Sequence, residues 1–277
     1  MSGAAALGRL RAAAGRHSVL IASISTLVVL ALLVLLVALS PGLREVQQAF
    51  FSPTHFRESF GAVWDGFKIN LKLMIEAEAI VLVFALLIAI VRGLPGAAAF
   101  PLRLLALLYV DFFRGVPLIL VVFVIGLGVP ALGIDFLYTR DPLIYALVSL
   151  VLVYSAYVAE VYRAGIDSVH SSQVAAARSL GLSHGQSLRH VVVPQAVRRV
   201  IPPLLNDFIG LQKDTALVSF IGVIDSVREA TSYSAVTFNF TGYTVAAVLF
   251  VALTIPMARV TDYLVERDRS KMRALGG

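Results

Sequence analysis

Long apolar stretches alternate with short polar ones along most of this chain. A helix needs roughly 20 predominantly apolar residues to cross about 30 Å of hydrocarbon, and six stretches are long enough. The pattern therefore predicts an all-α integral membrane protein. The six predicted transmembrane helices lie near residues 19–40, 66–91, 103–129, 143–165, 201–224 and 243–264.

The composition agrees with a membrane protein. Hydrophobic residues make up 58% of the 277 and charged residues 14%, whereas a soluble domain is about half apolar and a quarter charged. The net charge of +6 does not indicate nucleic acid binding, because the arginines are spread over loops beside apolar stretches, as membrane topology requires. The chain has no cysteine, which excludes disulfides and thiolate metal sites.

The basic residues also predict an orientation. Fifteen lysines and arginines lie in the two terminal tails and in the loops 92–103 and 163–200, and four lie in the loops of the opposite side. Because the side richer in lysine and arginine faces the cytoplasm, we expect a multi-pass protein of the plasma (inner) membrane with both termini in the cytoplasm.

The polar stretch between about residues 160 and 219 interrupts the apolar pattern. Lipid offers no hydrogen-bond partners to an irregular backbone, so this insert must lie outside the bilayer. Ser172 is expected to cap a helix over 173–180, Gly181 to end it in a left-handed conformation, and Ser183 with Gln186 to open a second helix. The sequence thus predicts a helix–turn–helix projection within 167–196.

Three prolines follow this projection. Pro194, with Pro202 and Pro203 beyond it, is expected to interrupt the chain before the next transmembrane helix, since proline breaks the hydrogen-bond ladder of a helix interior.

Several motifs in this part of the chain carry a specific resemblance. The runs AAARSLG, LGLS and VVVPQA resemble the EAA coupling loop of ABC-importer permeases, and AYVAEVYRAGI, QKDTALVSFIGV and FFRGVPLI are similar to the branch that takes up polar amino acids. The resemblance covers roughly residues 66–264. The family usually reads Gly-Gln-x-Glu-Ala-Ala, and its glutamate is missing from Ser172, Gln173, Val174, Ala175, Ala176 and Ala177.

The resemblance implies a type I ABC importer permease, which moves a polar or charged amino acid by alternating access. Implied partners are two ATP-binding subunits that carry ATP and Mg, a second permease chain (identical or related) and an extracytoplasmic amino-acid-binding protein. It also implies a permease core over 66–264, after a region 1–65 that holds the N-terminal tail, the first transmembrane helix and an extracytoplasmic segment, and before a cytoplasmic tail 265–277. The residues implied in coupling to the ATPase are Ser172, Gln173, Ala175, Ala176, Ala177, Gly181, Ser183 and Pro194.

Ionisable residues within apolar spans are costly and usually face a cavity or a partner. Glu160 is a candidate for binding the ammonium group of an amino acid, or alternatively for an ion pair with Arg114, Arg163 or Lys213. Arg114 and Lys213 are candidates for the substrate carboxylate or for structural pairing. Neutral contacts are expected from Asn70 and Gln212.

Two other functions remain open. One is an ATP-independent secondary transporter or channel, which would leave the polar insert without a purpose. The other is a regulatory membrane protein on a permease-like scaffold, which the missing glutamate favours. The chain has no G-x-x-x-x-G-K-[ST] phosphate loop, so we expect ATP hydrolysis on other subunits, and no motif of an enzyme or of a metal site.

Overall fold

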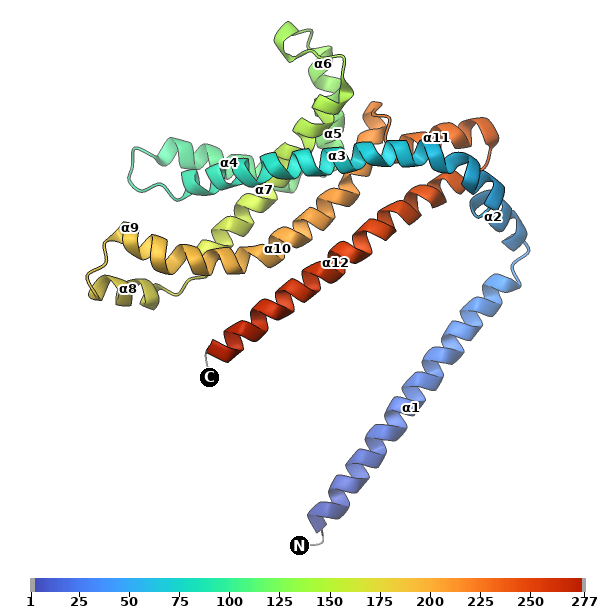
Figure 1. The fold of residues 1–277 in the computed structure, drawn as a ribbon, viewed down its shortest axis with the longest axis horizontal. Coiled ribbons are helices and arrows are strands. Elements are labelled where there is room, and N and C mark those ends of the chain that lie inside the picture. Colours follow the sequence, from blue (N-terminus) through green and yellow to red (C-terminus); the bar gives the residue numbers. More distant parts are fainter. Residues whose placement is uncertain (1–2, 276–277) are drawn as a thin grey trace. The chain divides into compact units, whose positions relative to one another are not determined.

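The computed structural model describes the backbone of residues 3–275 and the side chains of residues 21–183, 185–267 and 270. The chain divides between Ser52 and Pro53 into two units (Figure 1). The N-terminal unit holds α1 (Gly3–Ala38) and α2 (Leu43–Phe50). All described side chains of α1 are exposed, and from Leu27 to Ala38 they are apolar around the whole helix, as in a span that faces lipid.

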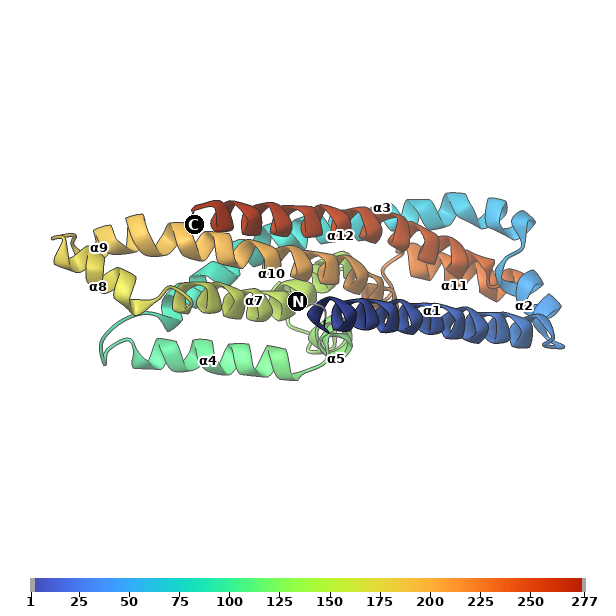
Figure 2. The same ribbon diagram turned by 90° about the horizontal axis from the view of Figure 1, so that it is seen from below.

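The second unit, which begins at Pro53, contains the remaining helices. In Figure 2 its long helices run side by side, with α8 and α9 at one end and α11 at the other. The helices are α3 (Pro53–Arg92), α4 (Phe100–Gly115), α5 (Leu118–Phe123), α6 (Val129–Ala131), α7 (Pro142–Asp167), α8 (Ser171–Ser179), α9 (His184–Ser187), α10 (Val193–Asp214), α11 (Ser226–Thr237) and α12 (Thr241–Leu275). Within the described backbone all regular elements are helical, which confirms the predicted all-α class.

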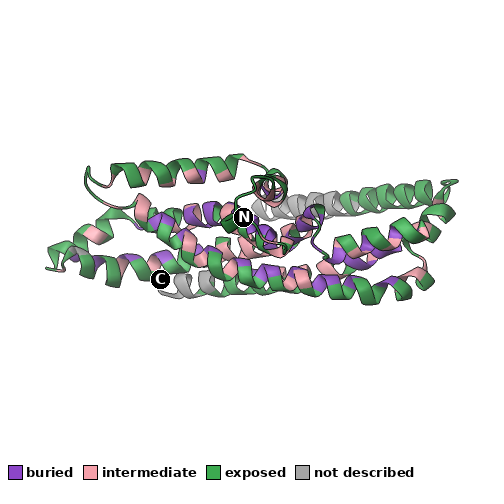
Figure 3. Ribbon diagram, turned by 90° about the horizontal axis from the view of Figure 1, so that it is seen from above, coloured by how far each residue is buried: buried purple, intermediate pink, exposed green. Residues whose placement is uncertain are grey.

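The core lies mainly between α3 and α7, and Leu211 of α10 packs against it. Figure 3 colours the buried residues purple. On α3 the buried side chains recur every three or four residues, so they form one inward stripe from Val63 to Ile88. Many buried positions are small, including Ala77, Ala85 and Ala146. Small residues let membrane helices approach closely, which is how such helices associate without a hydrophobic driving force between them.

The expected count of six transmembrane helices is not confirmed. Among the residues that the structure describes, four helical segments are long and apolar enough to span a membrane. There are five if α4 and the segment Leu118–Ala131, which meet at a bend of 106°, make one broken span. The bend falls at Pro117, where proline ends the regular hydrogen-bond ladder. The stretch expected at 201–224 is not among them, because α10 carries too many polar residues and ends at Asp214.

The expectation that three prolines interrupt the chain is wrong. Pro194 lies in the first turn of α10, directly after a π-helical turn, Leu188–Val192. Pro202 and Pro203 lie inside α10. A helical path therefore runs without a break from α9 to the end of α10.

A buried amide joins α3 to the segment before α11. The Nδ2 group of Asn70 donates to the carbonyl of Thr215 (3.1 Å) and to Oδ2 of Asp225 (3.0 Å), and its Oδ1 accepts from the backbone N–H (3.1 Å) and hydroxyl (2.7 Å) of Ser226. Asp225 also caps α11 by accepting from the N–H of Arg228. Every hydrogen-bonding group of the Asn70 amide is therefore used within the protein.

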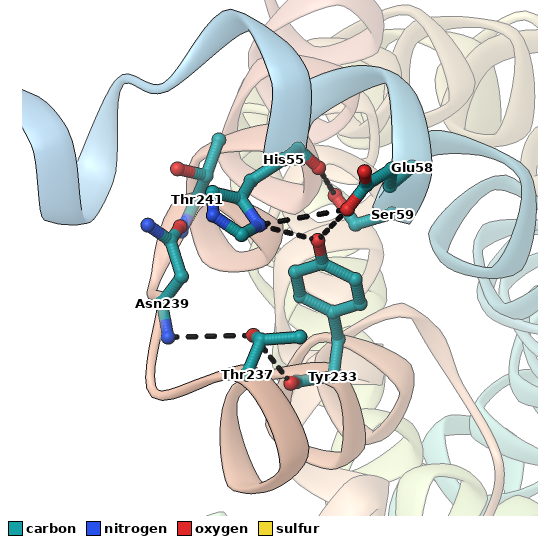
Figure 4. A network of polar contacts seen from close by, with 7 residues as sticks. All are labelled: His55, Glu58, Ser59, Tyr233, Thr237, Asn239 and Thr241. Carbon is teal, nitrogen blue, oxygen red and sulfur yellow. Dashed lines mark hydrogen bonds and ion pairs between the residues drawn. The ribbon is translucent and has the colours of Figure 1, made fainter.

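A second polar cluster joins the first turns of α3 to α11 (Figure 4). The hydroxyl of Tyr233 donates to Oε2 of Glu58 (2.8 Å) and lies 2.6 Å from Nδ1 of His55. Burial, and then the hydrogen bond to Glu58, raises the pKa of Tyr233 to about 12, so the phenol keeps its proton and remains a donor at neutral pH.

Gly66 is required where α3 crosses the backbone before α11. A Cβ atom at this position would lie 2.5 Å from the carbonyl carbon of Asp225 and 2.6 Å from the nitrogen of Ser226. We predict that Gly66→Ala lowers the free energy of unfolding by roughly 1–3 kcal/mol, because the backbone must shift and strain the Asn70 hydrogen bonds. Thermal unfolding of the purified protein in detergent measures this change.

The matched control is Gly61→Ala on the same helix, where nothing lies within 4 Å of the added Cβ. Alanine is the better helix former, so this variant should be as stable as the natural chain or slightly more so. Equal stability of the two variants would contradict the close approach at Gly66.

Candidate functional site

The helix–turn–helix projection expected from the sequence is present as a hairpin of α8 and α9. Gly181 adopts φ +89° and ends α8 as predicted. The N–H of Gly181 donates to the carbonyl of Arg178 (3.0 Å), and that of Leu182 donates to the carbonyl of Ala177 (3.2 Å), the Schellman arrangement. Ser183 and Gln186 form the predicted reciprocal cap at the start of α9, with bonds of 2.8 and 3.2 Å.

The prediction that Ser172 caps α8 is wrong. The capping residue is His170, whose Nδ1 accepts from the N–H of Ser172 at 3.3 Å. The hydroxyl of Ser172 lies 2.7 Å from the same nitrogen, so it supports the cap from inside the helix. The helix starts two residues earlier than expected, at Ser171, because an imidazole nitrogen can accept in place of a serine oxygen.

The other residues that the resemblance implies in coupling lie along this hairpin. Gln173, Ala175 and Ala176 are exposed on α8, whereas Ala177 is buried. Pro194 is exposed at the start of α10. The hairpin itself packs on a small apolar cluster of Val169, Val174, Val192 and Ala196, so its solvent-facing side carries the remaining residues.

A first cavity, of about 500 Å³, lies between α7 and α10 on the side of the hairpin. Arg114 of α4 contributes to its wall. The helices meet closely beneath it, because a Cβ on Gly165 would collide with Val200. The cavity is lined by Arg114, Tyr157, Glu160, Val161, Ala164, Gly165, Ser168, Arg199, Pro203 and Asp207.

A second cavity, of about 290 Å³, continues from the first, with which it shares Tyr157 and Asp207. The hydroxyl of Tyr154 donates to Oδ2 of Asp214 at 2.8 Å, and Gly210 leaves room for that ring. The lining residues are Leu118, Val153, Tyr154, Tyr157, Asn206, Asp207, Gly210 and Asp214. Together the two cavities follow one face of α7 and one face of α10.

Sequence reasoning missed most of this lining. A usable signal was the spacing of Arg199, Asn206, Gly210 and Asp214 on α10, because residues three, four or seven apart share a helix face. That face is polar or small within an otherwise apolar stretch, which marks a wall of a cavity rather than a surface against lipid.

Glu160 and Arg114 are the two substrate-binding candidates that the structure brings together. The carboxylate of Glu160 forms an ion pair with Arg92 of α3, and its second oxygen lies 4.0 Å from Arg114. Arg92 was not among the expected partners. Its side chain is 7% exposed, whereas that of Arg114 is 43% exposed. Arg92 is thus the buried partner that fixes Glu160, and Arg114 keeps donors free toward the first cavity.

The other three candidates lie elsewhere. Asn70 is committed to the network before α11 described above. Gln212 is buried against α12 and accepts from the hydroxyl of Thr254 at 2.8 Å. Lys213 is exposed and lines neither of the two cavities. In the part of the chain with described side chains, no group of three or more acidic or histidine residues could hold a metal ion.

Residues 96–270 match the family "binding-protein-dependent transport system inner membrane component". The chain belongs to this family. It is a permease subunit of an ABC importer, which confirms the resemblance found in the sequence. The permease is 34% identical over 212 residues to the probable glutamine ABC transporter permease protein GlnM of Bacillus subtilis, covering 76% of this chain and 94% of that protein.

Other relatives agree with this assignment. The arginine transport system permease protein ArtQ of Bacillus subtilis is 31% identical over 207 residues, covering 74% of this chain and 91% of its own. The crystal structure of an amino acid ABC transporter with histidines is 32% identical, with a TM-score of 0.69, and covers 75% of this permease and 94% of that chain. As a transport subunit with this fold, the permease is an integral inner-membrane protein.

The ion pair between Arg92 and Glu160 yields a stability prediction. Glu160→Gln leaves the buried Arg92 guanidinium without its counter-charge, so the free energy of unfolding should fall by about 3 kcal/mol, the low end for a buried pair because the Glu160 side chain is 30% exposed. Thermal unfolding in detergent measures the loss. Replacing both Arg92 and Glu160 by methionine removes the unpaired charge and should recover most of the lost stability.

Asp167→Asn serves as the control, because it breaks the exposed pair between Asp167 and Arg163 on the same helix. An exposed pair contributes about 0–1 kcal/mol. If Glu160→Gln were no more destabilising than Asp167→Asn, Arg92 would not depend on Glu160.

Proposed function

We propose that this permease carries polar or charged amino acids into the cell along the two cavities between α7 and α10. Support comes from relatives that are similar over most of their length and are described as transporting glutamine and arginine. The cavities add physical support, since they carry carboxylates, guanidinium groups and tyrosine rings within a membrane protein. Positively and negatively charged groups together suit a zwitterionic solute.

The proposed orientation follows the positive-inside rule, with both termini and the α8–α9 hairpin in the cytoplasm. Two ATP-binding subunits, which hold ATP and Mg, bind there and perform the hydrolysis. An extracytoplasmic amino-acid-binding protein delivers the solute at the α11 end. A second permease chain, identical or related, completes the pathway.

The hairpin is the proposed docking element for an ATP-binding subunit. Leu180 at its tip is 82% exposed, although it is a large apolar residue, and such a side chain gains stability when a partner covers it. The proposed contact includes six exposed residues of the hairpin: Ser172, Gln173, Ala175, Ala176, Gly181 and Ser183. Ala177 is buried on α8, and Pro194 lies at the start of α10. Ala175 stands where the family has glutamate, so docking here relies on shape and apolar contact.

One observation carries the proposed mechanism: the helical path from α9 through the π-helical turn to the end of α10 has no break. This continuous helical path connects a displacement of the hairpin to Asn206 and Asp207 in the cavities. ATP-driven closure of the partner subunits would swing the hairpins and open the pathway outward, and hydrolysis would reset it. This is alternating access by rigid-body motion.

Gly181→Pro tests the proposed coupling. Proline cannot adopt φ +89° and has no N–H to donate to Arg178, so the end of α8 must rearrange. We predict that amino-acid uptake by the reconstituted complex, with its ATP-binding and solute-binding partners, falls at least about tenfold. A tenfold fall corresponds to destabilising the docked hairpin by about 1.4 kcal/mol. ATP hydrolysis should lose its stimulation by substrate.

The control is Gly96→Pro, which imposes the same restriction on a glycine with φ +88° in the loop between α3 and α4. It should leave stimulated hydrolysis within about twofold. Retained stimulation in Gly181→Pro, with the complex assembled, would contradict coupling through this hairpin. Uptake without any ATP-binding subunit would overturn the proposed function.

A further inference from the structure

The two cavities differ in the balance of their charges. In the first, Glu160 is paired with Arg92 and lies near Arg114, and Arg199 donates to the carbonyl of Ser168. In the second, Asp207 and Asp214 face the space, and none of the described residues that line it carries a positive charge. The charged residues that line the second cavity are therefore all acidic, whereas the first cavity is lined by charged residues of both signs.

The two carboxylates of the second cavity are only partly satisfied by the protein. Asp214 accepts one hydrogen bond, from the hydroxyl of Tyr154. The Oδ2 atom of Asp207 is buried and has no hydrogen-bond partner among the described residues. A buried carboxylate without a cation is costly within a membrane, so an incoming cation at this position gains more than it would at a satisfied site.

The walls also favour a cation. The rings of Tyr154 and Tyr157 flank the space, and tyrosine faces attract ammonium and guanidinium groups. Tyr157 lies between the compartments, with the Arg114 guanidinium carbon 5.9 Å from its ring centre. The combined space thus presents the donors of Arg114 in the first cavity, the carboxylate of Asp207 where the two cavities meet, and that of Asp214 in the second cavity.

We propose that this arrangement selects amino acids with a cationic side chain. The α-carboxylate of the solute lies toward Arg114, and its side-chain ammonium or guanidinium group enters the second cavity between Asp207 and Asp214. A neutral side chain would leave both carboxylates uncompensated, and an acidic one would be repelled. The inference rests on the proposed import of amino acids and names the class among them.

The test measures binding of arginine, lysine, glutamine and glutamate to the purified complex of the permease and its ATP-binding subunits in lipid nanodiscs, by titration calorimetry. Leaving out the solute-binding protein separates the preference of the permease from that of the delivery protein. We expect arginine and lysine to bind at least about tenfold more tightly than glutamine, since a charge-assisted hydrogen bond to a buried group is strong. Asp207→Asn should remove most of that preference, and Asp207→Glu should restore part of it.

The matched control is Asp111→Asn, which removes a carboxylate from α4 that lines neither cavity. Its arginine affinity should stay within about twofold, and elution volume and thermal unfolding show that each variant is folded. Glutamine or glutamate binding as tightly as arginine, or Asp207→Asn keeping the preference, would overturn the inference while leaving amino-acid import intact. If none of the twenty amino acids binds or is taken up with the solute-binding protein present, the proposed function fails as well.

Discussion

The cost of placing charge in an apolar environment is the constraint on which the rest of this structure depends. A charged side chain within the membrane must face a partner or a wetted cavity. Arg92, Glu160 and Arg114 come from three different helices and meet at one place, so their pairing fixes how α3, α4 and α7 lie together. Asp207 and Asp214, two carboxylates that this group does not neutralise, lie along the cavities.

The same constraint explains the composition of α10. A helix with lipid on all sides would have to be predominantly apolar, as α1 is from Leu27 to Ala38. α10 instead buries Val200 and Leu211 against its neighbours and contributes Arg199, Asn206 and Asp207 to the walls of the cavities. α10 is therefore not apolar enough over its length to be recognised as a membrane span, although it belongs to the permease core. Its prolines fit this setting, since backbone groups freed by proline are tolerated where a helix lines a cavity.

The sequence predicted local features well because their causes are local. The end of α8 at Gly181 and the cap formed by Ser183 and Gln186 follow from backbone freedom and from side chains three residues apart. The error at Ser172 was also local, since the imidazole of His170 competes for the same N–H. The family was recognisable from motifs in the same region, and the match over residues 96–270 confirms it.

The candidate site was harder to predict because its contacts are distant in sequence. Arg92 and Glu160 are 68 residues apart. The sequence placed Arg92 in the predicted loop 92–103 and gave no sign that it pairs with Glu160. Asn70 was expected to face solute, but its amide is used by Thr215, Asp225 and Ser226, more than 140 residues away. Which polar group faces a cavity and which one joins two helices depends on packing that a hydropathy pattern does not contain.

The central claim is that the face of α7 and α10 borders an aqueous path that moves with the hairpin. Because the chain has no cysteine, the most direct measurement is the reaction rate of Asn206→Cys with a charged, water-soluble thiol reagent in the reconstituted complex. Leu86→Cys on the exposed apolar side of α3 serves as the comparison. The account predicts that Asn206→Cys reacts, at a rate that changes when ATP is bound, while Leu86→Cys stays unreactive. Equal rates at both positions, or a rate at Asn206→Cys that does not change when ATP binds, would contradict this account.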